Sequence, residues 1–146
     1  MTAADRRLLG VDVGERRIGV AVSQGRIAVP LTIIEHETRA LDLERVAAAA
    51  RDQGADAIVV GLPLHMSGDE GEQARRSRRF GDALARRAGV PVVYQDERYS
   101  TAAVASAAGG RIESARGAKR RGKPRVDDLA AAVILQAYID GQEAAE

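Results

Sequence analysis

The chain has 146 residues, no cysteine and a formal net charge of +1, which fits one domain over residues 1–146 that buries a core without disulfides. The lack of cysteine excludes disulfides, thiolate metal sites and a cysteine nucleophile. The N-terminal residues are charged, and no apolar run reaches the roughly 18 residues that a membrane helix needs, so we expect a cytoplasmic protein with no membrane partner.

The first part of the sequence predicts a hairpin followed by a third strand. Residues 8–13 and 18–22 are short, apolar and rich in β-branched side chains, and residues 14–17 between them fit a turn. Residues 27–34 fit a third strand. Pro30 favours an edge position for this strand, because proline cannot donate a hydrogen bond to a neighbouring strand.

A helix and a buried strand are predicted next. The helix covers residues 41–53 and ends before Gly54, since glycine is typical of the position after a helix. Its apolar stripe consists of Leu43, Val46, Ala47 and Ala50. Residues 57–62 are continuously apolar, which is typical of a strand covered on both faces. Residues 63–71 fit a loop.

A second helix and a fifth strand follow. The helix is predicted from about residue 70 to residue 88, with Gly89 after its end, and the strand covers residues 90–94. The apolar stripe of this helix consists of Ala74, Ser77, Gly81, Leu84, Ala85 and Ala88.

The last third of the chain predicts a short helix over residues 101–108, a basic mobile loop over 109–124 and an apolar helix over 127–140. A hairpin-led set of strands followed by alternating helices and strands is typical of an α/β fold. We therefore expect a mixed five-stranded sheet with helices on both faces.

Asp12 lies near the end of an otherwise apolar strand. Burial of an unpaired carboxylate is unfavourable, and open α/β sheets bind their ligands at the carboxyl ends of strands. We therefore favour a functional role for Asp12 over a role as a cap of the following turn.

Two further acidic clusters lie at the ends of predicted elements. Asp96 and Glu97 follow the fifth strand, and Asp127 and Asp128 begin the last helix. Taken alone, an exposed turn and a helix cap explain these clusters well, and periodicity does not choose between Asp127 and Asp128. Taken with Asp12, they indicate a carboxylate site for Mg²⁺ or Mn²⁺, ions that can promote phosphodiester hydrolysis.

A basic segment precedes the last helix. Residues 116–125 hold six positive charges and no acidic residue, namely Arg116, Lys119, Arg120, Arg121, Lys123 and Arg125. Residues 1–73 carry 8 basic and 12 acidic side chains, a net of −4, whereas residues 74–146 carry 14 and 9, a net of +5. This asymmetry is equally compatible with an arginine-rich helical surface, but a basic loop beside an acidic site favours binding to nucleic acid phosphates.

The sequence resembles the YqgF/RuvX family, which comprises pre-16S rRNA nucleases and Holliday junction resolvase-like proteins. Four segments carry the resemblance and together span nearly the whole chain. They are residues 9–14 with 17–21; residues 60–63 with Met66, Gly68 and Gly71; residues 96–98 with Thr101; and residues 126–127 with 130–131 and 134–138.

The resemblance implies a ribonuclease H-like sheet with strand order 3-2-1-4-5. It implies that Asp12, Glu97 and Asp127 are catalytic residues that bind one or two Mg²⁺ or Mn²⁺ ions, and it selects Asp127 over Asp128 and Glu97 over Asp96. The expected products carry a 5′-phosphate and a 3′-hydroxyl. The expected substrates are pre-16S rRNA, branched DNA or both, and we expect Arg98 and the basic segment to contact their phosphates.

This strand order raises a geometric question. Asp12 and Glu97 would lie two strands apart, which is roughly 9–10 Å between backbones. The longer glutamate side chain, reaching across Gly61 of the strand between them, would have to close this gap.

Two alternative functions remain open at this point. A non-catalytic nucleic-acid-binding ribosome-assembly factor would have no use for carboxylates beside phosphates. The hairpin also resembles the phosphate-binding hairpin of sugar kinases and actin-like ATPases, but those proteins use two such domains. The sequence does not indicate RNA or DNA, endo- or exonucleolytic cleavage, or the oligomeric state, although junction-cleaving enzymes commonly act as homodimers.

Overall fold

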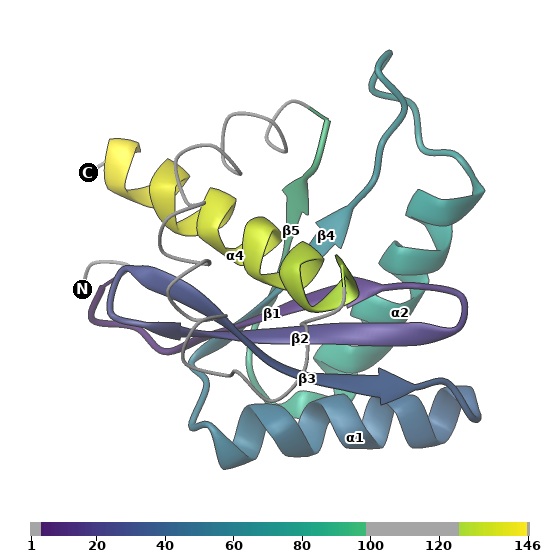
Figure 1. Ribbon diagram of the computed structural model, residues 1–146. Helices are drawn as coiled ribbons and strands as arrows, with labels where there is room; N and C mark the ends of the chain where they lie inside the picture. Colours follow the sequence, from purple (N-terminus) through teal and green to yellow (C-terminus); the bar gives the residue numbers. More distant parts are fainter. Residues whose placement is uncertain (1–3, 99–125, 146) are drawn as a thin grey trace.

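The computed structural model describes residues 4–98 and 126–145, with side chains described for residues 4–98 and 129–145. Five strands form one sheet in the order β3-β2-β1-β4-β5, as expected (Figure 1). β1 pairs antiparallel with β2, and β2 with β3, whereas β1–β4 and β4–β5 are parallel. The strands are β1 (Leu8–Val13), β2 (Arg17–Gln24), β3 (Ile27–Glu35), β4 (Ala57–Leu62) and β5 (Val92–Asp96).

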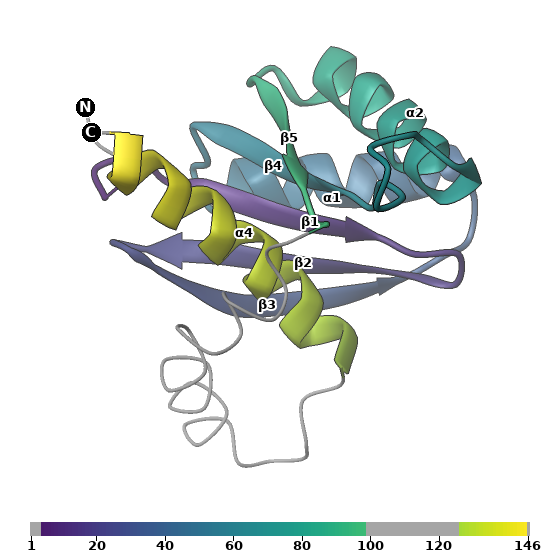
Figure 2. The same cartoon turned by 90° about the horizontal axis from the view of Figure 1, so that it is seen from above.

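Helices cover both faces of the sheet, which confirms the expected architecture (Figures 1 and 2). The helices α1 (Arg39–Asp52) and α2 (Glu72–Ala88) pack on one face, and α4 (Val126–Ala145) crosses the other. Each face has its own apolar core, one beneath α1 and α2 and one beneath α4. Within the part of the chain that the structure describes, no helix is long and apolar enough to span a membrane.

The helix stripes agree with the sequence except at two positions of α2. All four predicted stripe residues of α1 are buried. In α2, Ala85 is exposed although it was expected in the core, and Phe80 is buried instead. Phe80 lies three residues after Ser77 and four before Leu84, so the helical period places it between two buried residues.

The boundaries of β5 differ from the prediction in a way that matters for the site. The strand was expected at residues 90–94, but it begins at Val92 and ends at Asp96. Gly89 has a left-handed backbone (φ 75°), and Pro91, which has no N–H, accepts a hydrogen bond from the Ile58 amide at 2.9 Å. The first two predicted residues therefore serve as a connection.

Pro30 lies in the edge strand β3, as predicted. The register between β2 and β3 shifts beside it, so that Val20 faces Thr32 and Ala21 faces Pro30. An irregularity at an edge is where a sheet tolerates a residue that cannot donate. The helix expected over residues 101–108 and the loop expected over 109–124 lie outside the described residues.

Candidate nuclease site

The parallel strands β1, β4 and β5 end at the same edge of the sheet, and the candidate site lies there. Val11 is paired with Val60, so the next residues along these strands, Asp12 and Gly61, are neighbours. Gly61 is in turn paired with Gln95. Glu97 follows two positions later, and its amide continues the ladder by donating to the Leu62 carbonyl at 3.2 Å. Because side chains alternate along a strand, Asp12 and Glu97 face the same side of the sheet.

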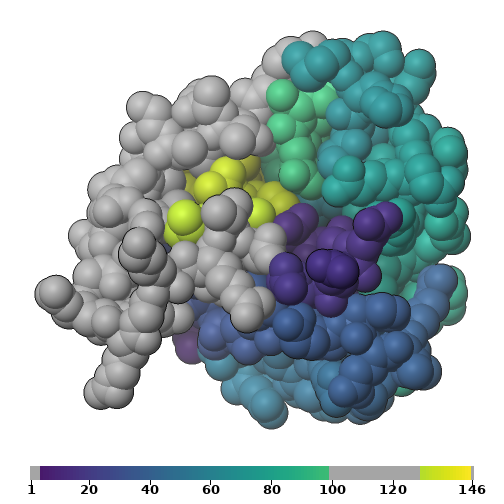
Figure 3. All heavy atoms as spheres, turned by 45° about the vertical axis from the view of Figure 1, so that its right-hand side comes forward, coloured from purple at the N-terminus to yellow at the C-terminus, as the bar shows by residue number. Residues whose placement is uncertain are grey.

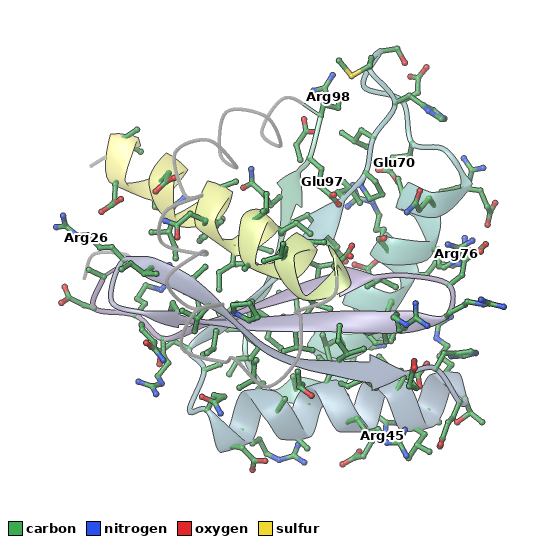
Figure 4. The ribbon with its side chains drawn as sticks, in the orientation of Figure 1. Arg26, Arg45, Glu70, Arg76, Glu97 and Arg98 are labelled. Atoms are coloured by element: carbon green, nitrogen blue, oxygen red, sulfur yellow. The ribbon has the colours of Figure 1, made fainter. Side chains whose placement is uncertain are left out.

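Gly61 allows Glu97 to reach back across β4. A Cβ at position 61 would lie 2.6 Å from Glu97 Oε2 and 2.5 Å from Ile134 Cδ1, both closer than such atoms can approach. The Glu97 carboxylate therefore occupies the space over this glycine, beneath α4, on the path from β5 to β1 (Figure 4). This arrangement answers the geometric question raised by the strand order.

Burial and charge both act on Glu97. Desolvation, followed by the negative charges of Asp12 and Asp96, raises the pKa of Glu97 from an ordinary 4.5 to about 7. The carboxylate is thus close enough to Asp12 for the two charges to repel. A partly buried pair of carboxylates that disfavours its own ionised form gains strongly from a bound cation.

Asp96 has a different role from its neighbour. Its carboxylate accepts hydrogen bonds from Arg98 Nε at 2.9 Å, from Arg98 Nη2 at 2.8 Å and from the Arg98 amide at 2.9 Å. These bonds lower the pKa of Asp96. Arg98 also donates to the Met66 carbonyl at 3.3 Å, so the Asp96–Arg98 pair ties the end of β5 to the loop after β4. The expected contact of Arg98 with phosphate stays a prediction.

Asp127 lies in the first turn of α4. The helix lies close on β1, since a Cβ at Gly10 would be 2.7 Å from Leu135 Cβ and 3.1 Å from the Ala131 carbonyl. Near its other end, Glu143 pairs at 3.0 Å with Arg26 of the β2–β3 turn, which adjoins the amino end of β1. The helix therefore runs in the opposite direction to β1 as it crosses the sheet, with its first turn on the side of the carboxyl end of β1.

The helical period also relates Asp127 to the site. Asp127 precedes Ala131 by four residues and Ile134 by seven, so it shares a helix face with the residues that contact Gly10 and Gly61. The side chains of Asp127 and Asp128 lie outside the described part. Among the side chains that the structure does describe, no three His, Cys, Asp or Glu residues are grouped to hold a metal ion. A third protein ligand for an ion held by Asp12 and Glu97 would have to come from a residue whose side chain lies outside the described part.

Of the residues predicted to contact nucleic acid, only Arg98 lies within the described part of the chain. The basic segment at 116–125 lies outside the described residues, so its contacts stay predictions. The structure adds basic residues that the sequence analysis missed, because Arg16, Arg17 and Arg76 line a groove together with Asp12. Arg16 lies in the turn after β1 and Arg17 begins β2, so both are near Asp12 in the sequence, which is a signal that the sequence carried. Arg76 comes from α2, and only the fold brings it there.

Comparison with known proteins assigns the chain to a family. A family profile described as "RuvX: Holliday junction resolvase" matches residues 6–141. A protein of Anaeromyxobacter sp. (strain Fw109-5) named "Putative pre-16S rRNA nuclease" is 45% identical over 140 residues, which cover 94% of this chain and 99% of the relative. A protein of the same name from Lactococcus lactis subsp. cremoris (strain MG1363) is 39% identical over 139 residues, covering 92% and 94%.

Solved structures share the fold. T. thermophilus RuvC in complex with a Holliday junction substrate matches with a TM-score of 0.59 and 16% identity, covering 90% of this chain and 91% of RuvC. The fowlpox virus Holliday junction resolvase matches with a TM-score of 0.55 and 12% identity, covering 92% and 99%. The family match spans nearly the whole chain, and the structural matches are to ribonuclease H-like resolvases. The chain therefore belongs to the RuvX family of nucleases, which is built on the ribonuclease H-like fold.

Proposed function

We propose that this protein is a metal-dependent nuclease that hydrolyses phosphodiester bonds, with Asp12, Glu97 and Asp127 as its metal-binding catalytic residues. The observation that carries the proposal is the position of the Glu97 carboxylate over Gly61, within electrostatic reach of Asp12. Carboxylate oxygens are the ligands that Mg²⁺ and Mn²⁺ prefer, so the chemistry of the pair fits such ions. When bound, one or two of these ions would activate water and stabilise the leaving oxygen.

The protein's own residues would divide the remaining work. Asp12 and Glu97 extend from rigid strands, which favours a fixed geometry for the ions. Glu97 holds a proton up to about pH 7 in the absence of a cation, and binding of the cation would release this proton. Asp127 would add a carboxylate from the start of α4. Arg98 and the basic segment at 116–125 would position phosphates on either side.

Two substrate classes follow from the relatives. The curated relatives are named for pre-16S rRNA, and the family description names the Holliday junction. We propose processing of the 5′ end of pre-16S rRNA, cleavage of branched DNA, or both, as the reaction of this chain. The rRNA reaction would place the protein in the cytoplasm. Cleavage of a symmetric junction would favour a homodimer.

The proposal is tested by cleavage of three end-labelled substrates: single-stranded RNA, single-stranded DNA and a four-way DNA junction. The assays contain Mg²⁺ or Mn²⁺, with EDTA as a control. We expect Asp12→Asn to fold and to lose about 10²–10³-fold in rate, because it removes a negatively charged ligand of the ion that stabilises the transition state. Asp52→Asn is the matched control, since Asp52 is exposed at the end of α1. It should cleave like the wild type.

The non-catalytic assembly factor makes the opposite prediction. A pure binder would show no cleavage of any of the three substrates, and Asp12→Asn would bind nucleic acid at least as tightly as the wild type, because a repulsive charge is removed. That pair of results would overturn the nuclease proposal. The substrate that is cleaved fastest would separate the rRNA reaction from the junction reaction.

A further inference from the structure

Two adjoining hollows lie at the carboxyl end of β1, and Asp12 lines the first of them. The first is the open groove that Asp12 shares with Arg16 and Arg76. The second is a pocket of about 330 Å³ between the β1–β2 turn, the start of α1 and the start of α2. Gly14, Glu15 and Arg76 line both hollows, so the groove leads from Asp12 around the end of the sheet to the pocket, which lies on the face covered by α1 and α2. Figure 3 shows the purple β1–β2 turn between the teal of α2 and the blue of β3 and α1.

The pocket combines an apolar floor with a basic rim. Val13, Ile18 and Phe80 form the floor, and each is at most 6% exposed. The arginines that line the rim are Arg39, Arg76 and Arg79. Arg76 extends from α2 on the side of the β1–β2 turn (Figure 4). A pocket of this composition suits a ligand with a flat apolar part and an adjoining anionic group.

The basic rim is held by weak interactions. Arg76 pairs with Glu15 at 3.2 Å, and Arg79 pairs with Glu72 at 3.2 Å. Both pairs are solvent-exposed, and such pairs contribute little to stability. A phosphate can therefore replace the carboxylate partners and gain charge-assisted hydrogen bonds from the same guanidinium groups.

The buried carboxylate in the pocket wall does not oppose an anion strongly. Asp42 is 3% exposed. Its Oδ1 accepts a hydrogen bond from the Glu37 amide at 3.1 Å, and its Oδ2 lies 2.5 Å from His36 Nδ1. Asp42 is thus engaged by groups of the loop before α1. Three arginines and one further carboxylate, Glu15, line the pocket, and Glu15 pairs with Arg76.

We propose that this pocket binds one unpaired nucleotide of the substrate strand, at the same end of the sheet as the bond that is cleaved. The inference rests on the proposed nuclease function and names the substrate class for that site. The base would contact the apolar floor, and the adjoining phosphate would contact the arginine rim. A base can reach such a floor only where it is unpaired or splayed out of a helix. The protein therefore selects a single-stranded or branched position at the carboxyl end of β1.

The experiment measures binding separately from cleavage. Fluorescence anisotropy gives the Kd of a single-stranded oligonucleotide of about 12 nucleotides in EDTA, and a gel confirms that the oligonucleotide is intact. A series of oligonucleotides carries one abasic site at successive positions, and a fully paired duplex completes the set. The proteins are the wild type, Arg39→Ala, Arg79→Ala and the control Arg51→Ala. Arg51 lies at the far end of α1 in a similar exposed pair with Glu44.

We expect Arg39→Ala and Arg79→Ala each to weaken binding of the intact single strand about five- to tenfold, with less than about twofold for Arg51→Ala. One abasic position should weaken wild-type binding by a similar factor and should have a smaller effect on the two rim variants. The duplex should bind more weakly than the single strand.

A flat abasic series, or rim variants that bind like Arg51→Ala, would overturn the pocket proposal whether or not the protein cleaves. A position-specific effect in a protein that cleaves nothing would leave the pocket standing and remove the nuclease function.

Discussion

At the scale of single residues, the site depends on the lack of a side chain at Gly61. The Glu97 carboxylate lies where any side chain at that position would lie, and burial there raises its pKa to about 7. The same close approach brings Ile134 of α4 onto the strand. Gly61 therefore determines both the space that the Glu97 carboxylate occupies and the burial that raises its pKa.

Gly61→Ala tests this coupling. The added methyl group would overlap Glu97 and Ile134, so we expect a loss of about 1–3 kcal/mol in the free energy of unfolding and weaker Mg²⁺ binding. Gly141→Ala is the matched control on α4, because no atom lies within 4 Å of its added Cβ. It should gain about 0.5–1 kcal/mol from helix propensity. Urea unfolding and Mg²⁺ titration calorimetry measure both effects; unchanged Mg²⁺ affinity in Gly61→Ala would contradict the assigned role of the glycine.

The raised pKa of Glu97 predicts a pH dependence with a definite sign. The folded protein holds this proton more tightly than the unfolded chain, whose glutamate titrates near 4.5. The stabilisation is therefore complete below pH 4.5 and is lost as the pH rises to about 7. In EDTA, the wild type should lose about 1–3 kcal/mol more stability than Glu97→Gln between pH 4.5 and 8. Equal losses in denaturant unfolding would refute the assigned shift.

A metal ion reverses this dependence. The ion competes with the proton on Glu97, so Mg²⁺ affinity should rise with pH up to about 7, by at most about tenfold per pH unit. Above that pH the affinity should level off. As the pH rises, the stability in EDTA should fall and the Mg²⁺ affinity should rise. These opposite trends distinguish the titration of a metal ligand from a general effect of pH on the fold.

At the scale of elements, α4 determines how the sheet and the site are joined. Gln136 is fully buried on this helix. Its Oε1 accepts a hydrogen bond from the Ala28 amide at 2.9 Å, and its Nε2 donates to the Arg26 carbonyl at 2.9 Å. These bonds anchor the helix to the start of β3, while Gly10 admits it closely over β1. These contacts fix the direction in which the helix crosses the sheet.

Gln136→Leu should weaken this anchor. The variant leaves the amide of Ala28 and the carbonyl of Arg26 without these partners, so we expect a loss of about 1–3 kcal/mol in the free energy of unfolding. Arg26→Ala is the control, because it removes only the exposed Arg26–Glu143 pair between the same elements. Its effect should stay below about 1 kcal/mol. Similar losses in the two variants on thermal unfolding would argue against the anchor.

At the scale of the whole molecule, strand order and charge distribution act together. The order β3-β2-β1-β4-β5 brings the carboxyl ends of three parallel strands to one edge. Acidic groups lie at this edge, and arginines from the β1–β2 turn and from α1 and α2 line the hollows beside it. Phosphates that approach the acidic centre would thus be drawn in by the basic surroundings.

The basic segment at 116–125 should contribute to binding in a salt-dependent way. We expect the triple variant Lys119→Gln, Arg120→Gln and Arg121→Gln to bind single-stranded nucleic acid more weakly at low salt. The slope of log K against log salt concentration should become shallower by about 0.7 for each phosphate that the variant no longer neutralises. Anisotropy titrations at several salt concentrations measure this slope, and an unchanged slope would exclude the segment from the interface.

Much of the fold was predictable because its signals are local. Apolar runs, helical stripes and the glycines after α1 and α2 depend on residues that are neighbours in the chain, and the first strands and the stripe of α1 were predicted correctly for that reason. The presence of Asp12 and Glu97 at strand ends could also be read from the sequence, and the family resemblance identified them as one site. The buried stripe of α2 was predicted incorrectly at Phe80 and Ala85, because either of two neighbouring helical positions can pack on the core.

Only the tertiary structure decided which of these residues meet. The register of β5 against β4 gives Asp96 and Glu97 different surroundings, because it turns one carboxylate to Arg98 and the other across Gly61. The pocket at the carboxyl end of β1 needs the β1–β2 turn, the start of α1 and α2 at one place. The sequence by itself determined the elements and the chemical groups at their ends, because propensity and periodicity are local. Packing between segments far apart in the chain determined the distances, burial and pKa values on which the function depends.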